Sequence, residues 1–365
     1  MKFLIWQWGR RGAGPRFAAE IAVTLRELPG HDGALSLSTQ AELLRGAAPP
    51  RCDLPFSTYS GLPGFLLRLP TAPFEVPSLA ARIRALAPDV AICGMPAALD
   101  LVMAAALRRA GVPFLVVVHD ADAHPGDSFP LQMVLQRWLV RRADGVICLT
   151  SHVAARLRAQ GLAAGKPLIM AAHPPFAFGP PPPPPWAHGG PLRLLSFGRL
   201  LPYKGHDLLA AALARLGPRP DLSVRVVGSG PESTALEALR RLDGVTVENR
   251  WVPEDEVGAL LAWADALVLS YTEASQSGVA AAAVSARRWV VATRVGGFTE
   301  QLAGEPLARF CDPTPESLAT ALRGLLECPP DPAPAGDPRA AWRGTATALA
   351  DHIAAMLANR PARGS

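Results

Sequence analysis

Short apolar runs alternate with longer amphipathic stretches along most of the chain. In the first half the runs are KFLIW, PDVAICG, VPFLVVVHD, DGVICLTS and KPLIMAAH, each bounded by turn-forming residues. Continuous apolar strands separated by helices are typical of a parallel sheet covered on both faces. The first half is therefore predicted to be a doubly wound α/β domain.

Helical spacing appears between these runs. A helix is predicted to begin at Pro15, because Phe17, Ile21, Leu25 and Leu28 follow at one-face spacing. The stretches AALDLVMAAALRRAG and SHVAARLRAQG are also helical, the second with Ser151 as its expected N-cap. Residues 49–80, rich in proline and containing the apolar FLLRL, break the rhythm and are predicted to form an elaborated loop.

The stretch PPFAFGPPPPPPWAHGGP cannot be a helix or a central strand and is predicted to be a stiff spacer between two domains. After it the alternation restarts with LRLLSFG, SVRVVGSG, GVTVEN, DALVLSY, WVVATRV and ARFCD. The expected layout is a first domain over 1–175, a linker over 176–191 and a second domain over 192–328. A terminal helix over 339–360 is expected to complete the first domain. Ligands of such sheets bind outside the carboxyl ends of the strands.

Composition narrows the class of protein. The chain has 365 residues, which favours two domains, and its 49% hydrophobic and 18% charged residues are typical of a globular protein. Five scattered cysteines without a C-x-x-C pair indicate a reducing compartment, and no apolar run is long enough to span a membrane. We therefore expect a cytoplasmic protein.

The charge is unevenly distributed. Residues 1–190 contain 18 Lys/Arg and 12 Asp/Glu, a net of +6, whereas residues 191–365 contain 18 and 19, a net of −1. The basic residues do not cluster with aromatic residues, which argues against a nucleic-acid partner. An anionic membrane surface or a phosphorylated substrate fits the basic first half better.

The stretch FGRLLPYKG carries the first candidate chemistry. Arg199 and Lys204 flank a turn that is expected to open a helix near Gly205. Two cations beside a helix N-terminus can hold a diphosphate, although a solvated loop with incidental charges is the competing interpretation. Three further strand ends support the ligand interpretation: VVGSGPE, LVLSYTEASQSGV and TRVGGFTE. A dense polar set such as SYTEASQS is costly to bury without a polar ligand.

Four stretches resemble glycosyltransferase family 4 in their order and spacing: GRLLPYKG, VVGSGPE, ALLAWADALVLSYTEASQSG and VVATRVGGFTE. The resemblance is strong over about 190–305, whereas the first half matches in layout, in its Gly-rich first loop and in the His-Asp of VVVHD. It implies the GT-B fold, two Rossmann-like domains facing each other across a cleft, and a retaining transfer from a nucleotide sugar. It also implies that Arg199 and Lys204 grip the donor diphosphate and neutralise the leaving group.

The resemblance carries over to further positions. Glu273 corresponds to the first glutamate of the family's paired-glutamate signature, but position 281, where the second is expected, is alanine. The family uses this second glutamate on the nucleotide ribose, and Ser275, Gln276 and Ser277 are expected to take over its contacts with the donor. The expected donor-binding set is Gly12, Gly14, Gly198, Gly228, Gly230, Glu273, Ser275, Gln276, Ser277, Gly278 and Glu300.

The first half is expected to receive the acceptor. Arg16 and His124 are the candidate acceptor contacts, although Arg10, Arg11 and Arg16 can equally be surface charges. Within HDADAHPGD, His119 and Asp120 can line the reaction centre, can belong to a metal site with Asp122 and His124, or can only stabilise the loop. The GT-B resemblance favours the first, with no metal and no cofactor, because cationic side chains replace the metal.

The sequence thus predicts a retaining glycosyltransferase that moves a sugar from a nucleoside-diphosphate sugar to a saccharide or lipid-linked acceptor. Synthesis of cell-surface polysaccharide or glycoconjugate is the expected setting, with peripheral attachment to the inner face of the plasma membrane. The alternatives are a nucleotide-sugar epimerase of the same fold and a catalytically impaired sugar-nucleotide-binding protein.

Overall fold

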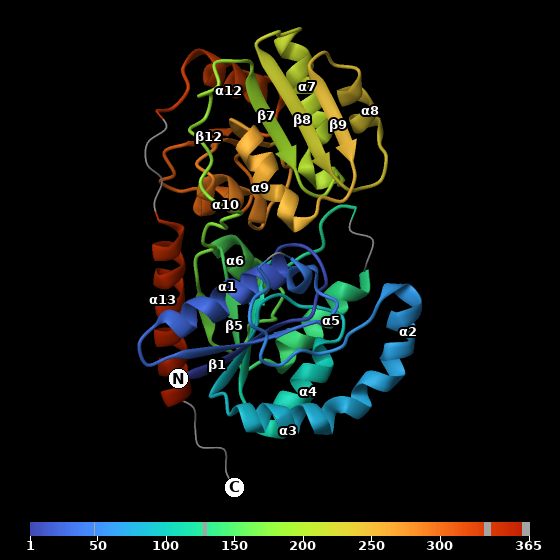
Figure 1. The fold of residues 1–365 in the computed structure, drawn as a ribbon, viewed down its shortest axis with the longest axis vertical. Helices are drawn as coiled ribbons and strands as arrows, with labels where there is room; N and C mark the ends of the chain where they lie inside the picture. The colour runs from blue at the N-terminus through green and yellow to red at the C-terminus, as the bar shows by residue number, and fades with distance from the viewer. Residues whose placement is uncertain (47, 127–129, 332–336, 360–365) are drawn as a thin grey trace. The chain divides into compact units, whose positions relative to one another are not determined.

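The structure is a computed structural model that describes residues 1–46, 48–126, 130–331 and 337–359. The chain divides into two compact units. Unit 1 comprises Met1–Asp122, Phe129–Ala172 and Arg339–Ser365, and unit 2 comprises Ala123–Ser128 and His173–Pro338 (Figure 1).

Unit 1 is built on a parallel six-stranded sheet in the order β2-β1-β3-β4-β5-β6. Its strands are β1 (Lys2–Gln7), β2 (Asp32–Leu37), β3 (Val90–Cys93), β4 (Phe114–Val118), β5 (Gly145–Cys148) and β6 (Leu168–Met170). The winding reverses between β1 and β3, which makes the ends of these strands the position where ligands of such sheets bind.

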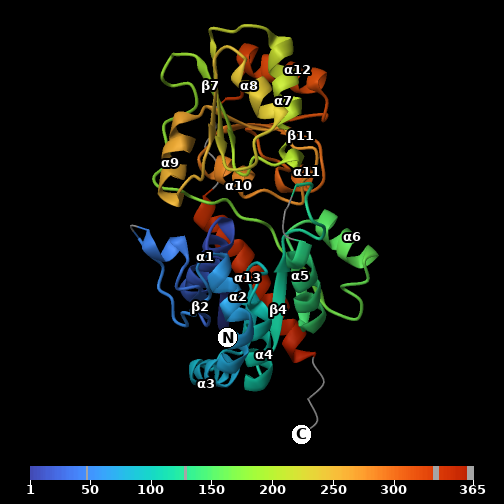
Figure 2. The ribbon, with the colours of Figure 1, turned by 90° about the vertical axis from the view of Figure 1, so that its right-hand side faces the viewer.

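Helices flank this sheet (Figures 1 and 2). They are α1 (Ala13–Glu27), α2 (Gly61–Thr71), α3 (Val76–Leu86), α4 (Asp100–Ala110), α5 (Pro130–Arg142), α6 (Ser151–Ala159) and α13 (Pro338–Ala358), with short 3-10 turns η1 (Glu42–Arg45) and η2 (Ala72–Glu75). The terminal helix α13 packs on unit 1: Trp342 meets Phe17 edge-on at 5.7 Å, and Arg339 pairs with Glu20 and Glu27.

Unit 2 has a second parallel sheet in the order β12-β11-β10-β7-β8-β9. Its strands are β7 (Leu192–Phe197), β8 (Leu222–Gly228), β9 (Val245–Asn249), β10 (Ala266–Leu269), β11 (Trp289–Thr293) and β12 (Ala308–Cys311). Its helices are α7 (His206–Leu216), α8 (Thr234–Arg240), α9 (Glu254–Trp263), α10 (Gly278–Ser285), α11 (Phe298–Gln301) and α12 (Pro315–Glu327), and η3 (Pro202–Lys204) precedes α7. Separate apolar cores cover the two faces of this sheet. The winding reverses between β7 and β10.

The predicted doubly wound α/β architecture is confirmed in both units. Every apolar run that was predicted to be a strand forms one. Strand β2 was not predicted, because its DGALSL begins with an exposed aspartate and a glycine. The expected loop over residues 49–80 is wrong, because Leu62, Leu66 and Leu69 follow a helical spacing and lie in α2. Two helix starts are also corrected: α1 begins at Ala13 rather than Pro15, and α6 is capped by Thr150 rather than Ser151.

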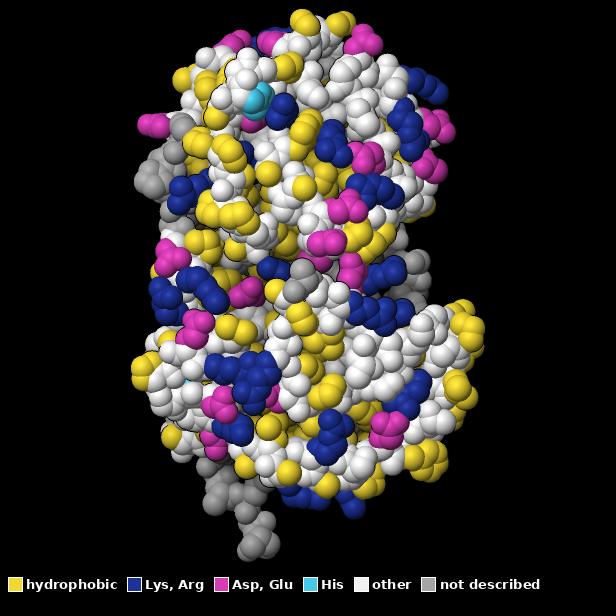
Figure 3. Space-filling model, in the orientation of Figure 1, with side chains coloured by type: hydrophobic (Ala, Val, Ile, Leu, Met, Phe, Trp, Pro, Cys, Tyr) yellow, Lys and Arg dark blue, Asp and Glu magenta, His cyan; other side chains and the backbone are white. Residues whose placement is uncertain are grey.

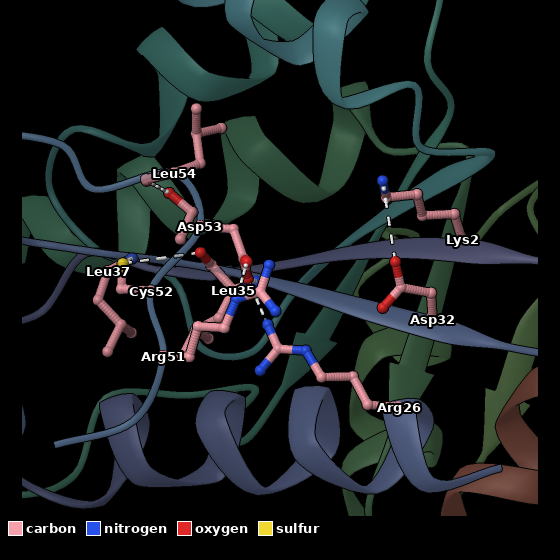
Figure 4. Close-up of polar contacts among 10 residues, drawn as sticks. Lys2, Arg26, Asp32, Leu35, Leu37, Arg51, Cys52, Asp53 and Leu54 are labelled. Atoms are coloured by element: carbon pink, nitrogen blue, oxygen red, sulfur yellow. Dashed lines mark hydrogen bonds and ion pairs between the residues drawn. The ribbon is translucent and has the colours of Figure 1, made fainter.

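The edge strand β2 is covered by the segment that follows it (Figure 4). The Asp53 carboxylate accepts a hydrogen bond from the Leu35 backbone N–H at 2.9 Å and forms ion pairs with Arg26 of α1 and with Arg51. The backbone N–H groups of Asp53 and Leu54 donate to the Leu35 carbonyl. These contacts satisfy backbone groups that an open sheet edge would expose.

The proline-rich segment before β7 is anchored to unit 2. The Asp265 carboxylate accepts hydrogen bonds from the backbone N–H groups of Trp186 and Arg193 and contacts His188 Nε2 at 3.0 Å. The buried Arg288 guanidinium donates to the Pro183 carbonyl. The segment therefore packs as part of unit 2 along much of its length.

All five cysteines are free thiols. Among the described residues, no helix is both long and apolar enough to cross a membrane.

Candidate functional site

The loop that leaves β7 folds a lysine back over the end of its own strand. Gly198 follows the strand with φ +121°, and a Cβ built there would lie 3.9 Å from Lys204 Nζ. Gly205, with φ +65°, ends the 3-10 turn and is the N-cap of α7. The predicted start of a helix near Gly205 is confirmed, and Arg199 and Lys204 both lie at the strand end where the winding reverses.

Two tyrosines hold these cations. Arg199 Nη2 donates to the hydroxyl of Tyr203 at 3.0 Å, and its guanidinium lies 5.6 Å from that ring's centroid. The Lys204 ammonium donates to the Tyr271 hydroxyl and lies 3.8 Å from the Tyr271 centroid and 5.0 Å from the Tyr203 centroid. Lys204 is buried, whereas Arg199 is exposed. The arrangement combines a fixed ammonium with a guanidinium that can reach solvent-borne ligands.

The charge of this cluster affects a neighbouring histidine. His206 begins α7 and is buried, and its pKa is lowered to about 4 by burial and by the adjacent Lys204 charge, with Asp207 opposing. Burial also raises the pKa of the Tyr271 hydroxyl well above its usual value. At neutral pH His206 is therefore neutral and adds no positive charge to this cluster.

Gly228 and Gly230 allow the end of β8 to approach the cation loop. A Cβ on Gly228 would lie 1.6 Å from the Gly198 carbonyl oxygen, and a Cβ on Gly230 would lie 2.2 Å from the Leu200 carbonyl oxygen. No side chain fits at either position, so both glycines serve the backbone packing that shapes the loop around Arg199.

The loop from β10 to α10 supplies the polar side of the site. The Ser277 hydroxyl accepts from the backbone N–H groups of Val279 and Ala280 and so caps α10, which begins at Gly278 as predicted. Gln301 of α11 holds Ser277 through two hydrogen bonds, at 2.8 and 2.9 Å. Ser275 is buried. The buried Oε1 of Gln276 accepts no hydrogen bond from any residue in the described part of the chain.

The position of the missing second glutamate is closed by packing. Ala281 is 4% exposed within the run of buried alanines in α10, and its carbonyl accepts a hydrogen bond from the Phe176 backbone N–H at 3.3 Å. The expected glutamate contact on a nucleotide ribose has no counterpart at this residue.

Glu273 lies beside a residue from the β4–α5 loop. His124 is stacked on Tyr203, with centroids 4.2 Å apart and an interplanar angle of 13°, and His124 Nδ1 lies 3.9 Å from Glu273 Oε1. His124 was predicted to contact the acceptor, whereas it belongs to unit 2 and packs on the cation loop. Glu300 is exposed on α11, after the two glycines of TRVGGFTE.

In unit 1 the first loop meets the end of β1. Gly12 has φ +83° and is the N-cap of α1. A Cβ on Gly14 would lie 2.9 Å from Gln7 Nε2 and 3.1 Å from Met95 Sδ, so the helix start approaches both β1 and the β3–α4 loop. Arg16, in the first turn of α1, is half-buried. Arg10 lies 4.7 Å from the Tyr59 ring centroid, and Arg11 is 4.0 Å from Glu42, so these two arginines have surface partners.

His119 lies at the carboxyl end of β4. Its Nε2 donates to the Gly94 carbonyl at 2.8 Å, its ring meets Phe17 edge-on at 5.0 Å, and burial lowers its pKa. The hydrogen bond fixes the proton on Nε2. Asp120 is half-buried, and its backbone carbonyl accepts from Gln136 at 2.6 Å.

The alternative metal site in HDADAHPGD does not assemble. Asp122 accepts from Arg156 and Gln160, each at 2.8 Å, which lowers its pKa, while His124 is stacked on Tyr203. Among the described residues, no group of three or more His, Cys, Asp or Glu side chains is arranged to hold a metal ion.

Three residues of the site were not predicted from the sequence: Tyr203, Tyr271 and Gln301. A signal was present for the tyrosines: the chain has only three, and two of them lie in the cation loop and the β10–α10 loop. Gln301 carries no signal in the sequence, because its contact with Ser277 depends on how α11 packs.

Comparisons with known proteins agree with this geometry. A family model described as Glycosyl transferases group 1 matches residues 191–328, and one described as Glycosyl transferase 4-like domain matches residues 12–171. A 2-deoxystreptamine glucosyltransferase of Streptomyces kanamyceticus is 30% identical over 284 residues, which is 69% of this chain and 71% of that protein.

Two solved structures show the same fold. A glycosyltransferase from Rickettsia africae has a TM-score of 0.68 at 16% identity, covering 98% of this chain and 99% of its own. HepE from Anabaena, solved with UDP, has a TM-score of 0.66 at 19% identity, covering 99% of this chain and 100% of its own.

Proposed function

The chain belongs to the glycosyltransferases with the GT-B fold, within family 4, and we propose that it transfers a hexose from a nucleoside-diphosphate sugar with retention of anomeric configuration. One observation carries the proposal: Arg199 and Lys204 are held side by side at the switch point of the unit 2 sheet by Tyr203 and Tyr271. UDP-glucose is the first donor to test, because HepE was solved with UDP-glucose and the Streptomyces relative is named a glucosyltransferase.

The charge of the leaving group explains the need for these cations. Breaking the sugar–phosphate bond leaves a nucleoside diphosphate with additional negative charge and an oxocarbenium-like sugar. Arg199 and Lys204 stabilise that charge as it develops. We propose that the transfer needs no bound metal, because the two side chains supply the positive charge.

Other polar groups of unit 2 complete the donor site in this proposal. The buried Oε1 of Gln276 is available to accept a hydrogen bond from the nucleotide or the sugar. Glu273 and Ser275 lie on the same loop. These side chains take over the ribose contact that Ala281 cannot make.

The acceptor is assigned to the carboxyl edge of the unit 1 sheet. The departing phosphate takes the proton of the acceptor hydroxyl, so no dedicated general base is required. His119, whose pKa is lowered and whose tautomer is fixed by Gly94, orients the acceptor together with Asp120 and Arg16. We propose a saccharide or lipid-linked acceptor, used in cell-surface polysaccharide or glycoconjugate synthesis at the cytoplasmic face of the plasma membrane.

The test begins with a thermal-shift panel of nucleoside-diphosphate sugars, since a ligand of the folded state raises its apparent stability. Release of nucleoside diphosphate from the stabilising donor is then measured for the wild type and for Arg199→Gln and Lys204→Met. Each substitution should lower the rate by about 100-fold or more. Arg219→Gln is the matched control, because that half-buried arginine pairs with Asp221 just before β8, at the opposite end of the strands from the cation loop.

Three outcomes separate the alternatives. Binding without turnover identifies a catalytically impaired protein, and release of an altered nucleotide sugar without acceptor, seen by NMR, identifies an epimerase. Full turnover in both cation variants contradicts the proposed role of the two side chains.

A further inference from the structure

Unit 1 exposes a cluster of large apolar side chains on α2 and η2. Leu62, Leu66 and Leu69 are 66%, 57% and 45% exposed and follow each other at i, i+4 and i+7, so they form one stripe of the helix. Leu67 and Phe74 are 68% and 84% exposed. Of the nine large apolar side chains that are exposed in the described chain, five therefore lie within residues 62–74. Figure 3 shows hydrophobic atoms gathered along this edge of unit 1.

A groove lined by arginines continues this surface. It has a volume of about 380 Å³ and is lined by apolar residues, among them Val76, Leu101 and Ala104, and by Arg108, Arg109 and Arg142. Val76 follows η2 directly, and η2 contacts α4, which contacts α5. The exposed leucines, the groove and α5 are thus neighbours on one surface.

The far side of the groove is both aromatic and basic. Trp138 of α5 is 47% exposed, and the Arg142 guanidinium lies 5.2 Å from its ring centroid. α5 contains Arg137, Arg141 and Arg142 and no acidic residue. Arginines beside an exposed tryptophan are typical of surfaces that contact the headgroup region of a membrane.

The segment around α2 is positively charged, like α5. Residues 43–86 contain five arginines and two acids, Asp53 and Glu75. Asp53 is paired with Arg26 and Arg51, and Glu75 is paired with Arg68, so neither carboxylate offsets the arginines of the groove. We name the surface formed by α2, η2, the groove and Trp138 the arginine-leucine face.

We propose that the arginine-leucine face docks unit 1 onto an anionic lipid bilayer, with phosphates in the groove and the leucines and Phe74 in the interface. Positive charge next to exposed apolar side chains matches the two forces that bind proteins to such a surface. A symmetric contact with a second copy fits less well, because it would bring the same arginines to the contact from both partners. This inference specifies which surface contacts the membrane in the proposed function, and it rests on that function for the identity of the acceptor.

The experiment is co-sedimentation of the full chain with vesicles. Vesicles of phosphatidylcholine alone are compared with vesicles containing about one third phosphatidylglycerol. The wild type should bind the anionic vesicles, and binding should weaken as salt is raised. Leu66→Glu with Phe74→Glu, and Arg108→Glu with Arg109→Glu, should each weaken binding by about tenfold or more.

Unit 2 offers matched controls. Trp251→Glu changes a 39%-exposed apolar side chain, and Arg241→Glu changes an 80%-exposed arginine, both outside the arginine-leucine face. Both should bind vesicles like the wild type. Circular dichroism melts will test whether each variant is folded. Donor hydrolysis by the same preparations should be unchanged, and this result separates the membrane inference from the proposed transfer chemistry.

Three results would overturn the proposal. In the first, the wild-type chain stays in the supernatant with anionic vesicles. In the second, the variants of the arginine-leucine face bind vesicles as well as the wild type does. In the third, the wild type is a dimer in solution that the Leu66→Glu, Phe74→Glu variant dissociates.

Discussion

Gly228 is the residue at which the shape of the cation loop can be tested most directly. A Cβ at this position would lie 1.6 Å from the Gly198 carbonyl oxygen, whereas ordinary contact begins near 3.4 Å. Gly228→Ala therefore requires the two backbones to separate by about 1.8 Å, the difference between those distances. Both partners are backbone, so no flexible side chain can absorb the change.

The separation has two measurable consequences. Overpacking of this kind costs about 3 kcal/mol, which lowers the melting temperature by roughly 6–12 °C. Arg199 directly follows Gly198, so its guanidinium also moves, and a misplacement of about 1 Å costs on the order of 100-fold in rate. We expect Gly228→Ala to remain folded and to lose at least that much in kcat/KM for the donor.

The assays are thermal melting and the initial rate of nucleoside-diphosphate release. Gly324→Ala in α12 is the control, because its Cβ would meet only the end of the Arg309 side chain, at 3.2 Å. Alanine is favoured over glycine in a helix by about 1 kcal/mol, so the control should be neutral or slightly stabilised and fully active. A Gly228→Ala chain with wild-type melting temperature and rate would refute the argument.

Three further predictions follow from buried polar groups of unit 2. Tyr271→Phe keeps the ring over Lys204 but removes the hydroxyl that accepts the hydrogen bond of the ammonium. We expect kcat to fall by about 10-fold with little change in melting temperature. Steady-state kinetics with an unchanged kcat would contradict this prediction. The pKa of His206 is lowered from 6.5 to about 4, so the stability that depends on its neutral form is complete above pH 6.5 and falls by about 3 kcal/mol as the pH approaches 4. His206→Gln should therefore make the melting temperature less dependent on pH between 6.5 and 4. Parallel curves of melting temperature against pH for the variant and the wild type would exclude the effect. Arg288→Ala leaves three backbone carbonyls without their buried donor and should cost about 3 kcal/mol in denaturant melts, whereas the exposed Arg241→Ala should cost nothing measurable.

The sequence alone determined the repeated strand–helix alternation, and with it the two doubly wound sheets. Strands buried on both faces read as continuous apolar runs, so KFLIW and DALVLSY could be recognised without tertiary information. The edge strand β2 could not, because its first residues resemble a turn and its pairing with β1 is a long-range contact. The order of polar motifs at strand ends also located Arg199 and Lys204, since the carboxyl ends of parallel strands share one edge.

Only the tertiary structure decided how these residues are held. Tyr271 reaches Lys204 from 67 residues away, and Gln301 reaches Ser277 across 24, and neither spacing follows any local periodicity. The stack of His124 on Tyr203 likewise joins a loop from the first half of the chain to a residue from the second half. The exposed stripe of α2 was not predicted either, because a loop was expected over residues 49–80 and the helix that aligns these leucines was missed. Local pattern determines which elements form, whereas contacts distant in sequence determine which side chains meet and which remain exposed.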